Sequence, residues 1–360
     1  MEFYNFISIF AKYLYAYLYF RMQRTIYIPN RLNWIDWAKV FAISCVVFGH
    51  TPQVPGSFPQ YFIVTFHMPL FFFISGYLTK KEYICAETMK KYWHTLIIPY
   101  LCYNLLFYPY WVLRHYIEVP NAVLFDYVKP IIGVFMLQGN SELYEPLNGV
   151  TWFIASLLGY KLILSICNRT KYGHVVIILL ILITTILYVH NQFHLYITDL
   201  TPVGFIKCLP FYFFGYYSKQ YKLISTTAKQ NDGFVGILCM CVSIFIFFIV
   251  KDKSNMIIYG LRYWLISLFA IYGTVGICKS LDRVRLKIIE NVAVGTIVIM
   301  GVHFILIGIT NYCIEKLLNI DGKIIYSWYV AFVLVLLFEA LIYPIIILFK
   351  NEYTFMLGKR

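Results

Sequence analysis

The stretch Ile35-Asp-Trp-Ala-Lys-Val-Phe-Ala-Ile-Ser-Cys-Val-Val-Phe-Gly-His50 is an apolar run that encloses Lys39 and ends on His50, eleven residues later. Eleven residues make about three turns of an α-helix, so the two side chains share one face roughly 16 Å apart. A charge inside hydrocarbon is costly unless it is paired or faces a polar cavity, which makes Lys39 a candidate functional residue. The alternative is that Lys39 snorkels to the membrane interface while His50 ends the helix in water.

The whole chain is strongly apolar. Of its 360 residues, 61% are hydrophobic and only 13% are charged, and the mean hydropathy is +0.70. This composition is far from that of soluble proteins and predicts an all-α, polytopic integral membrane helix bundle with about ten transmembrane helices. The expected spans are residues 35–51, 61–78, 92–113, 150–167, 172–190, 199–217, 233–250, 256–278, 289–311 and 325–349.

No polar stretch between these runs approaches the length of a soluble domain. We therefore expect a single transmembrane domain over residues 31–350, preceded by a cytoplasmic or interfacial segment (1–30) and followed by a short cytoplasmic tail (351–360). Within the first segment, the run from Tyr4 to Phe20 is broken by Lys12 and rich in tyrosine. This pattern favours an amphipathic helix on the membrane surface over an eleventh span.

The net charge is +13, and the basic residues are unevenly distributed between the two sides of the expected membrane topology. Of the 30 Lys and Arg residues, 20 lie in one alternate set of termini and connections, and six lie in the other set. The positive-inside rule assigns the richer set, including both termini, to the cytoplasm. Because cytoplasmic connections already account for the basic residues, the charge does not indicate nucleic-acid binding.

The second span contains the string Phe66-His-Met-Pro-Leu-Phe-Phe-Phe-Ile-Ser-Gly76. His67 in this string and His50 both lie toward the outer ends of their spans, so we expect the two imidazoles to share an outer vestibule. Ser75 and Gly76 form a small surface that either packs closely on another helix or lines a narrow channel. His67 and Ser75 are therefore candidate substrate-binding residues.

Two residues on other spans are further candidates for substrate binding. Trp152, at the outer start of the fourth span, is either an anchor at the membrane interface or a platform on which a ligand stacks. His303, in the outer part of the ninth span, would complete a polar cavity and orient a ligand there. The outer connection 114–149 is long enough to cover a binding site. Its acidic residues include Asp126, Glu142 and Glu145.

Two acidic residues are better explained by charge pairing than by catalysis. Asp36 lies one helical turn before Lys39, and we expect it to pair with Lys39 or Arg31. Glu339 lies inside the tenth span, where a carboxylate needs a partner, and we expect it to pair with an intramembrane cation. Two such cations are Lys207 and Arg262.

The nine cysteines do not indicate a disulfide framework or a metal site. Most of them fall within the expected spans, and the two in Cys239-Met-Cys241 point to different faces of a helix. Small buried thiols are the better interpretation, and we predict no metal. The sequence also lacks a phosphate-binding glycine loop and a Gly-x-Ser-x-Gly nucleophile motif.

Several of these strings together carry a resemblance to a known family. The segment Arg31-Leu-Asn-Trp-Ile-Asp36-Trp-Ala-Lys39, followed by His50 and the second-span string, resembles the opening signature of the acyltransferase-3 family of bacterial membrane O-acyltransferases. Within that family the chain is most similar to fucose 4-O-acetylases and to O-acetyltransferases of surface glycans. Three later strings also fit: Thr151-Trp-Phe-Ile-Ala155, Leu209-Pro-Phe-Tyr-Phe-Phe-Gly215 and Val298-Ile-Met-Gly-Val-His303.

The resemblance implies an enzyme of the bacterial inner membrane that transfers an acyl group, usually acetyl, from cytoplasmic acyl-CoA to a hydroxyl of a cell-envelope polysaccharide or a lipid-linked sugar. The basic residue of the family signature maps onto Lys39 and its essential histidine onto His50. Lys39 and Arg31 would then bind the donor, and His50 would be the base or the acyl carrier. The family often has arginine at the position of Lys39, and a lysine there lacks the planar fork that grips phosphate with two hydrogen bonds.

The geometry of the first span suits this chemistry independently. A cation near the inner side can neutralise a phosphate of CoA, and roughly 16 Å is comparable to an extended pantetheine arm. A histidine can deprotonate a sugar hydroxyl or accept the acyl group itself. The competing interpretation is a glycolipid transporter or flippase, which also needs charges along a path. Besides the bilayer and the glycan, the expected partners are a second copy of the chain or other proteins of glycan assembly.

Overall fold

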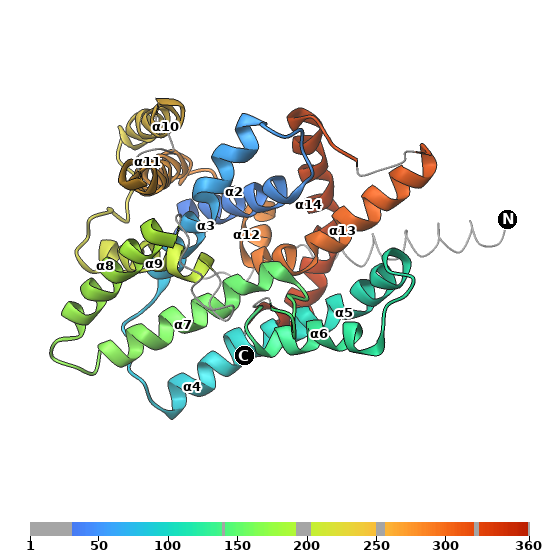
Figure 1. Cartoon of the computed structure of the whole chain (residues 1–360). Helices are drawn as coiled ribbons and strands as arrows, with labels where there is room; N and C mark the ends of the chain where they lie inside the picture. The colour runs from blue at the N-terminus through green and yellow to red at the C-terminus, as the bar shows by residue number, and fades with distance from the viewer. Residues whose placement is uncertain (1–30, 139–140, 192–202, 250–255, 320–323, 359–360) are drawn as a thin grey trace.

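A computed structural model describes residues 31–138, 141–191, 203–249, 256–319 and 324–358, and this part of the chain is helical (Figure 1). Its first half contains α2 (Asn33–His50), α3 (Phe58–Leu78), α4 (Ala86–Tyr92), the π-helical turn η1 (Trp93–Ile97), α5 (Ile98–Glu118), α6 (Leu124–Phe135), the short η2 (Gly149–Thr151), α7 (Trp152–Cys167) and α8 (Gly173–Asn191). Its second half contains α9 (Val203–Gln220), α10 (Asp232–Ile249), α11 (Met256–Ser280), α12 (Lys287–Val294), α13 (Thr296–Leu317), α14 (Trp328–Asn351) and η3 (Thr354–Leu357).

The prediction of an all-α, polytopic membrane bundle is confirmed. Each of the ten expected spans overlaps a helix, and seven helical segments in the described part are long and apolar enough to cross a membrane. The remaining spans correspond to α8, whose apolar stretch is shorter, and to α2 and α9. The last two carry polar residues because they are enclosed by other helices: α2 packs on α3, α11, α12, α13 and α14 (Figure 1). The expected interfacial helix in residues 1–30 lies outside the described residues.

The ninth span begins later than expected. The sequence predicted a start at residue 289, but the structure ends α12 at Val294 and begins α13 at Thr296, with Gly295 between them. A Cβ on Gly295 would lie 2.4 Å from the side chain of Ile346, so the chain turns at a position where α14 approaches closely. The start of the span was wrong because apolar periodicity alone does not reveal such a break.

A reciprocal glycine contact joins α3 to α9. A Cβ on Gly76 of α3 would lie 1.9 Å from the carbonyl oxygen of Tyr212, and a Cβ on Gly215 of α9 would lie 2.0 Å from the carbonyl oxygen of Phe73. Only glycine allows the two backbones to come this close. The small surface at Ser75 and Gly76 is therefore used for helix packing.

Two contacts between distant segments fix the ends of the bundle. After α2, the backbone around Gln53 pairs with Tyr326, which precedes α14. The N–H of Tyr326 donates to the carbonyl oxygen of Pro52 at 2.9 Å, and the N–H of Val54 donates to the carbonyl oxygen of Tyr326 at 3.1 Å. At the opposite end of α14, η3 packs on α5, where the hydroxyl of Tyr103 donates to the oxygen of Met356 (3.0 Å). The loop that follows His50 is thereby held against the start of α14.

The orientation of the bundle gives the first testable prediction. A tag inserted at Ser57, in the loop between α2 and α3, should be reachable by antibody on intact spheroplasts, whereas a tag at Ala86 should need permeabilisation. The reason is that Lys80, Lys81, Lys90 and Lys91 flank Ala86, while the loop at Ser57 has no charged residue. Reversed accessibility would invert the topology and place His50 at the cytoplasmic side.

Candidate active site

His50 is the last residue of α2, and its side chain opens into a cavity of about 810 Å³. The cavity is formed where α2, α5 and α13 end, at the side that the positive-inside rule assigns to the exterior. Its walls are largely apolar and contain several aromatic rings. They include Phe107, Tyr110 and Trp111 of α5 and Phe304 and Tyr312 of α13. A concave site with apolar walls and a few polar groups is the usual form of a small-molecule site.

His303 lies directly behind His50 and is buried, without lining the cavity itself. The two ring centroids are 5.3 Å apart, and Phe304 contacts His50 on its edge at 4.6 Å. The Nδ1 of the fully buried His303 is 2.9 Å from the carbonyl oxygens of both Ile299 and Met300. Carbonyls only accept hydrogen bonds, so Nδ1 carries the proton and Nε2 of the neutral ring is an acceptor. This Nε2 is buried without a hydrogen-bond partner in the described residues.

The polar groups of the cavity come mainly from the outer ends of α5 and α13. Arg114 donates to Glu118 across one helical turn at 2.8 Å, and the carboxylate of Glu315 accepts the backbone N–H of Ile324 at 3.3 Å. The sequence analysis did not select these residues. The available signal was an Arg-x-x-x-Glu pair at the outer end of an aromatic span.

The other charged residues of the signature lie at the inner end of α2 and just before it. They are Arg31, Asp36 and Lys39. Arg31 is fixed by the carboxylate of Asp36 and by the carbonyl oxygen of Glu290 in α12, to which it donates at 2.9 Å. Asp36 is buried beside it, as the charge-pairing interpretation expected. Lys39 lies one turn further along α2 and is half-buried. The contacts of Arg31 hold the start of α2 to α12.

The structure does not place His67 in the vestibule of His50. His67 is buried within α3, where its Nδ1 donates to the carbonyl oxygen of Ile63 at 2.9 Å, and it does not line the cavity. Since α3 begins at Phe58, His67 lies nine residues, or roughly 14 Å, below the outer end of its helix. His67 lies close enough to His50 for their charges to interact, but the ring in direct contact with His50 is that of His303.

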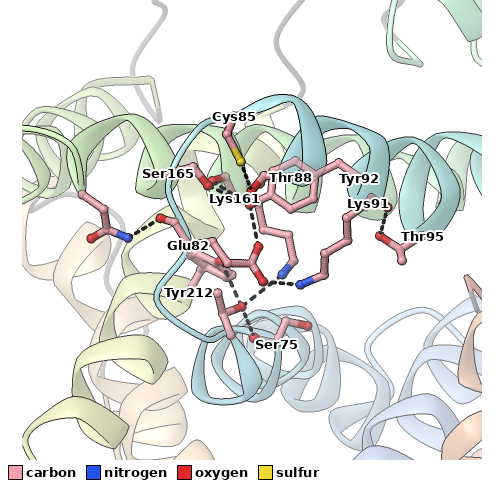
Figure 2. Close-up of polar contacts among 12 residues, drawn as sticks. Ser75, Glu82, Cys85, Thr88, Lys91, Tyr92, Thr95, Lys161, Ser165 and Tyr212 are labelled. Carbon is pink, nitrogen blue, oxygen red and sulfur yellow. Dashed lines mark hydrogen bonds and ion pairs between the residues drawn. The ribbon is translucent and has the colours of Figure 1, made fainter.

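Ser75 and Trp152 also lie away from this cavity. Ser75 is near the inner end of α3, where its carbonyl oxygen accepts the hydroxyl of Thr79 at 2.8 Å (Figure 2). Trp152 packs on Phe72, with ring centroids 5.7 Å apart, and against Gly204, where a Cβ would lie 2.7 Å from the indole. The expected role of both in substrate binding is replaced by helix packing, because their neighbours come from α3 and α9.

Glu339 pairs differently from the expectation. Its carboxylate accepts a hydrogen bond of 2.6 Å from the hydroxyl of Ser44, because α14 packs on α2. Lys207 lies over the ring of Tyr263 at 4.2 Å, and Arg262 donates to the carbonyl oxygen of Phe247 at 2.6 Å. Glu339 therefore joins two helices near Cys45 instead of neutralising either cation.

A polar cluster at the inner side of the bundle was missed by the sequence analysis. Glu82, in the loop after α3, forms an ion pair with Lys91 and accepts the hydroxyl of Tyr92 at 3.0 Å (Figure 2). Lys161 of α7 donates to Thr79 at 3.3 Å in the same cluster. Burial alone would raise the pKa of Glu82, but the hydrogen bond from Lys91, the charge of Lys161 and the Tyr92 hydroxyl hold that pKa below its ordinary value. The cluster thus fastens the α3–α4 loop onto α7.

Removing this carboxylate should destabilise the protein in a pH-dependent way. Glu82→Gln should lower the free energy of unfolding by about 1 kcal/mol near pH 7. Because the folded-state pKa is depressed, the contribution is present above the unfolded value of 4.5 and is lost as the pH falls through the folded value. Thermal unfolding of both proteins in detergent from pH 7 to pH 3 should show the difference shrinking, with the exposed Glu142→Gln as control. A difference that grows toward low pH would contradict the ion pair.

Comparison with known protein families identifies the family of the chain. A family profile described as an acyltransferase domain matches residues 32–348, which is most of the chain and includes Lys39, His50 and His303. No curated protein and no solved structure matches the chain. The resemblance seen in the sequence is thereby confirmed at the level of the family. The chain belongs to the acyltransferase-3 family and is a multi-pass membrane acyltransferase.

Proposed function

We propose that this protein is an O-acetyltransferase of the bacterial inner membrane, which moves an acyl group from cytoplasmic acyl-CoA to a hydroxyl of a glycan or glycolipid. The observation that carries the proposal is the contact between the buried His303 and His50, which lines a largely apolar cavity with aromatic rings in its wall. Aromatic rings pack on the apolar faces of sugars while polar side chains at the rim bind hydroxyls. The acceptor therefore binds on the outer side, next to a titratable base.

His50 acts as the general base in this proposal. Its unprotonated ring nitrogen takes the proton from the acceptor hydroxyl as the oxygen attacks the thioester carbonyl carbon. The new C–O ester bond forms as the C–S bond breaks, and the CoA thiolate takes the proton from the imidazolium of His50. No oxidant or reductant is needed. In the alternative route, His50 accepts the acyl group first, which would leave an acyl-enzyme that can be trapped when the acceptor is withheld.

His303 is a positioning residue for this step. Its Nδ1–H is committed to two backbone carbonyls, so its Nε2 can only accept a hydrogen bond. An N–H of His50 or the acceptor hydroxyl is a suitable donor at this position. Such a bond would hold the reacting groups without adding charge to a buried site.

Lys39 is proposed to bind the donor. It lies eleven residues before His50 on the same helix, roughly 16 Å along the axis, so a phosphate held by Lys39 would allow the pantetheine arm to extend toward His50. A lysine binds phosphate as a point charge, so it fixes the donor less rigidly than the arginine fork would. The donor would enter from the cytoplasm and the acceptor from the opposite side.

Thioester turnover tests the proposal. Purified protein in lipid nanodiscs is mixed with acetyl-CoA and a panel of free oligosaccharides and lipid-linked sugars, and free CoA thiol and acetylated sugar are measured together. We expect thiol release only when an acceptor is present, in equal amounts with the ester product. A flippase would move a labelled glycolipid without consuming acetyl-CoA, and that result would replace the proposed function.

A further inference from the structure

A second, smaller cavity adjoins the one that contains His50. Its volume is about 360 Å³, and its lining consists of Trp111, Arg114, His115, Glu118, Glu145 and Pro146. All but His115 and Glu145 also line the cavity of His50. The two compartments therefore share a wall, formed by the outer end of α5 and by the chain that leads to η2. The smaller volume still falls within the range of about 300–1,000 Å³ in which proteins bind small molecules.

The cavity of His50 is long in the direction of α5. Phe107, Arg114 and Glu118 all line it, and Arg114 and Glu118 come seven and eleven residues after Phe107 on the same helix. At 1.5 Å per residue, they lie roughly 10 and 16 Å further along the axis of α5, and the smaller compartment adjoins this outer part. A single sugar ring at His50 would not fill both compartments.

One polar atom in the smaller compartment points to a ligand. The ring of His115 stacks on Trp111 with centroids 4.5 Å apart and planes 14° apart, and its edge meets Tyr127 at 5.3 Å. The Nε2 of His115 is buried and has no hydrogen-bond partner among the described residues. A buried nitrogen without a partner is costly unless a ligand or a water supplies one. A sugar hydroxyl can either donate to it or accept from it.

The charges that line the two compartments are not balanced. Arg114 is paired with Glu118 at 2.8 Å, so this pair contributes no net charge. Glu145 lines the smaller compartment and Glu315 lines the larger one, and no cation among the lining residues offsets them. A cleft with apolar walls and uncompensated carboxylates carries a negative potential, which repels anions.

We propose that the smaller compartment is a distal subsite that binds a second sugar unit of the acceptor and selects uncharged or amine-bearing oligosaccharides over acidic ones. The proposal rests on the proposed function, because it assigns the reacting sugar to the cavity of His50. His115 binds a hydroxyl of the distal unit, and Glu145 excludes a carboxylate from the same place. The acceptor is thus an oligosaccharide of neutral or amino sugars and not a single sugar.

Charge selection is tested with two trisaccharide acceptors that differ by one carboxylate, one neutral and one with a distal uronic acid. We expect kcat/KM to favour the neutral acceptor, and Glu145→Gln to raise kcat/KM for the acidic acceptor about three- to tenfold. Glu142→Gln removes the same charge three residues earlier, at an exposed position outside both cavities, and should change neither value. Equal use of both acceptors, or the same gain in Glu142→Gln, would overturn the subsite.

Length selection is tested on the same preparations with a monosaccharide and a neutral trisaccharide. His115→Phe keeps the ring on Trp111 but removes the ring nitrogens, so its loss of kcat/KM should be about three- to tenfold larger for the trisaccharide than for the monosaccharide. An identical loss on both acceptors would overturn the assignment of His115. Acetylation of sugars without any preference for length or charge would overturn the subsite alone, whereas failure to acetylate any sugar would overturn the proposed function as well.

Discussion

Replacing His50 with alanine should abolish acyl transfer while the protein remains folded. A general base contributes about 10²–10⁴ to the rate, so turnover of acetyl-CoA in the presence of acceptor should fall by at least about a hundredfold. The fold should survive because His50 is exposed to the cavity at the end of α2, and α2 is held by the buried residues before it. Thiol release in nanodiscs measures the turnover, and size-exclusion chromatography with thermal unfolding measures the fold.

A control substitution tests whether the loss of activity is specific to His50 or follows from replacing any histidine. His94→Ala changes a half-buried histidine in η1, between α4 and α5, and should retain near-normal turnover. If His50→Ala keeps more than a tenth of the wild-type rate, His50 is neither the base nor the acyl carrier. Mass spectrometry of protein incubated with acetyl-CoA alone separates the two roles, because only the carrier would gain an acetyl group on His50.

Replacing Lys39 with methionine should weaken donor binding by a factor of about ten to a hundred or more. A charge-assisted contact to phosphate is worth roughly 1.5–3 kcal/mol, and methionine keeps much of the length of the side chain without the charge. Lys39→Arg should keep much of the affinity, since lysine binds as a point charge and arginine restores the charge. Isothermal titration with a nonhydrolysable acyl-CoA measures both variants, and the KM for the acceptor should stay nearly unchanged.

The control for Lys39 is another lysine inside a span. Lys207→Met removes an intramembrane charge on α9 that lies over the ring of Tyr263, and it should leave donor affinity unchanged. Equal affinity of wild type and Lys39→Met would show that Lys39 anchors α2 at the membrane interface. An equal loss of donor affinity in Lys207→Met would show that removing any intramembrane charge perturbs the bundle, and that Lys39 has no specific role in donor binding.

The sequence predicted the helices well because membrane spans are specified locally. An apolar run of sufficient length forms a helix whatever its neighbours are, so each expected span overlaps a helix, and the contact surface at Gly76 was identified from two small residues. The break at Gly295 was not identified, because it depends on the approach of Ile346 from another helix.

The site was less predictable because it depends on which helices meet and at what depth. Periodicity placed Lys39 and His50 on one face of α2, but it could not show that His303 would lie against His50 while His67 lies deeper in α3. The acidic connection before α7 was expected to be long enough to cover an acceptor site, and its Glu145 lines a cavity next to that of His50. The other wall of that cavity is formed by the outer end of α5. There the sequence showed only an Arg114–Glu118 pair among aromatic residues, which did not indicate a site.

The glycine contact between α3 and α9 limits the motions available during turnover. With the backbones at Gly76 and Tyr212 in van der Waals contact, sliding of one helix past the other by a single residue, about 1.5 Å, would drive neighbouring side chains into backbone atoms. The two helices must therefore move as one rigid body, and α3 also packs on α2. Rearrangements of the bundle during turnover would then occur between this helix pair and its neighbours, and not between α3 and α9.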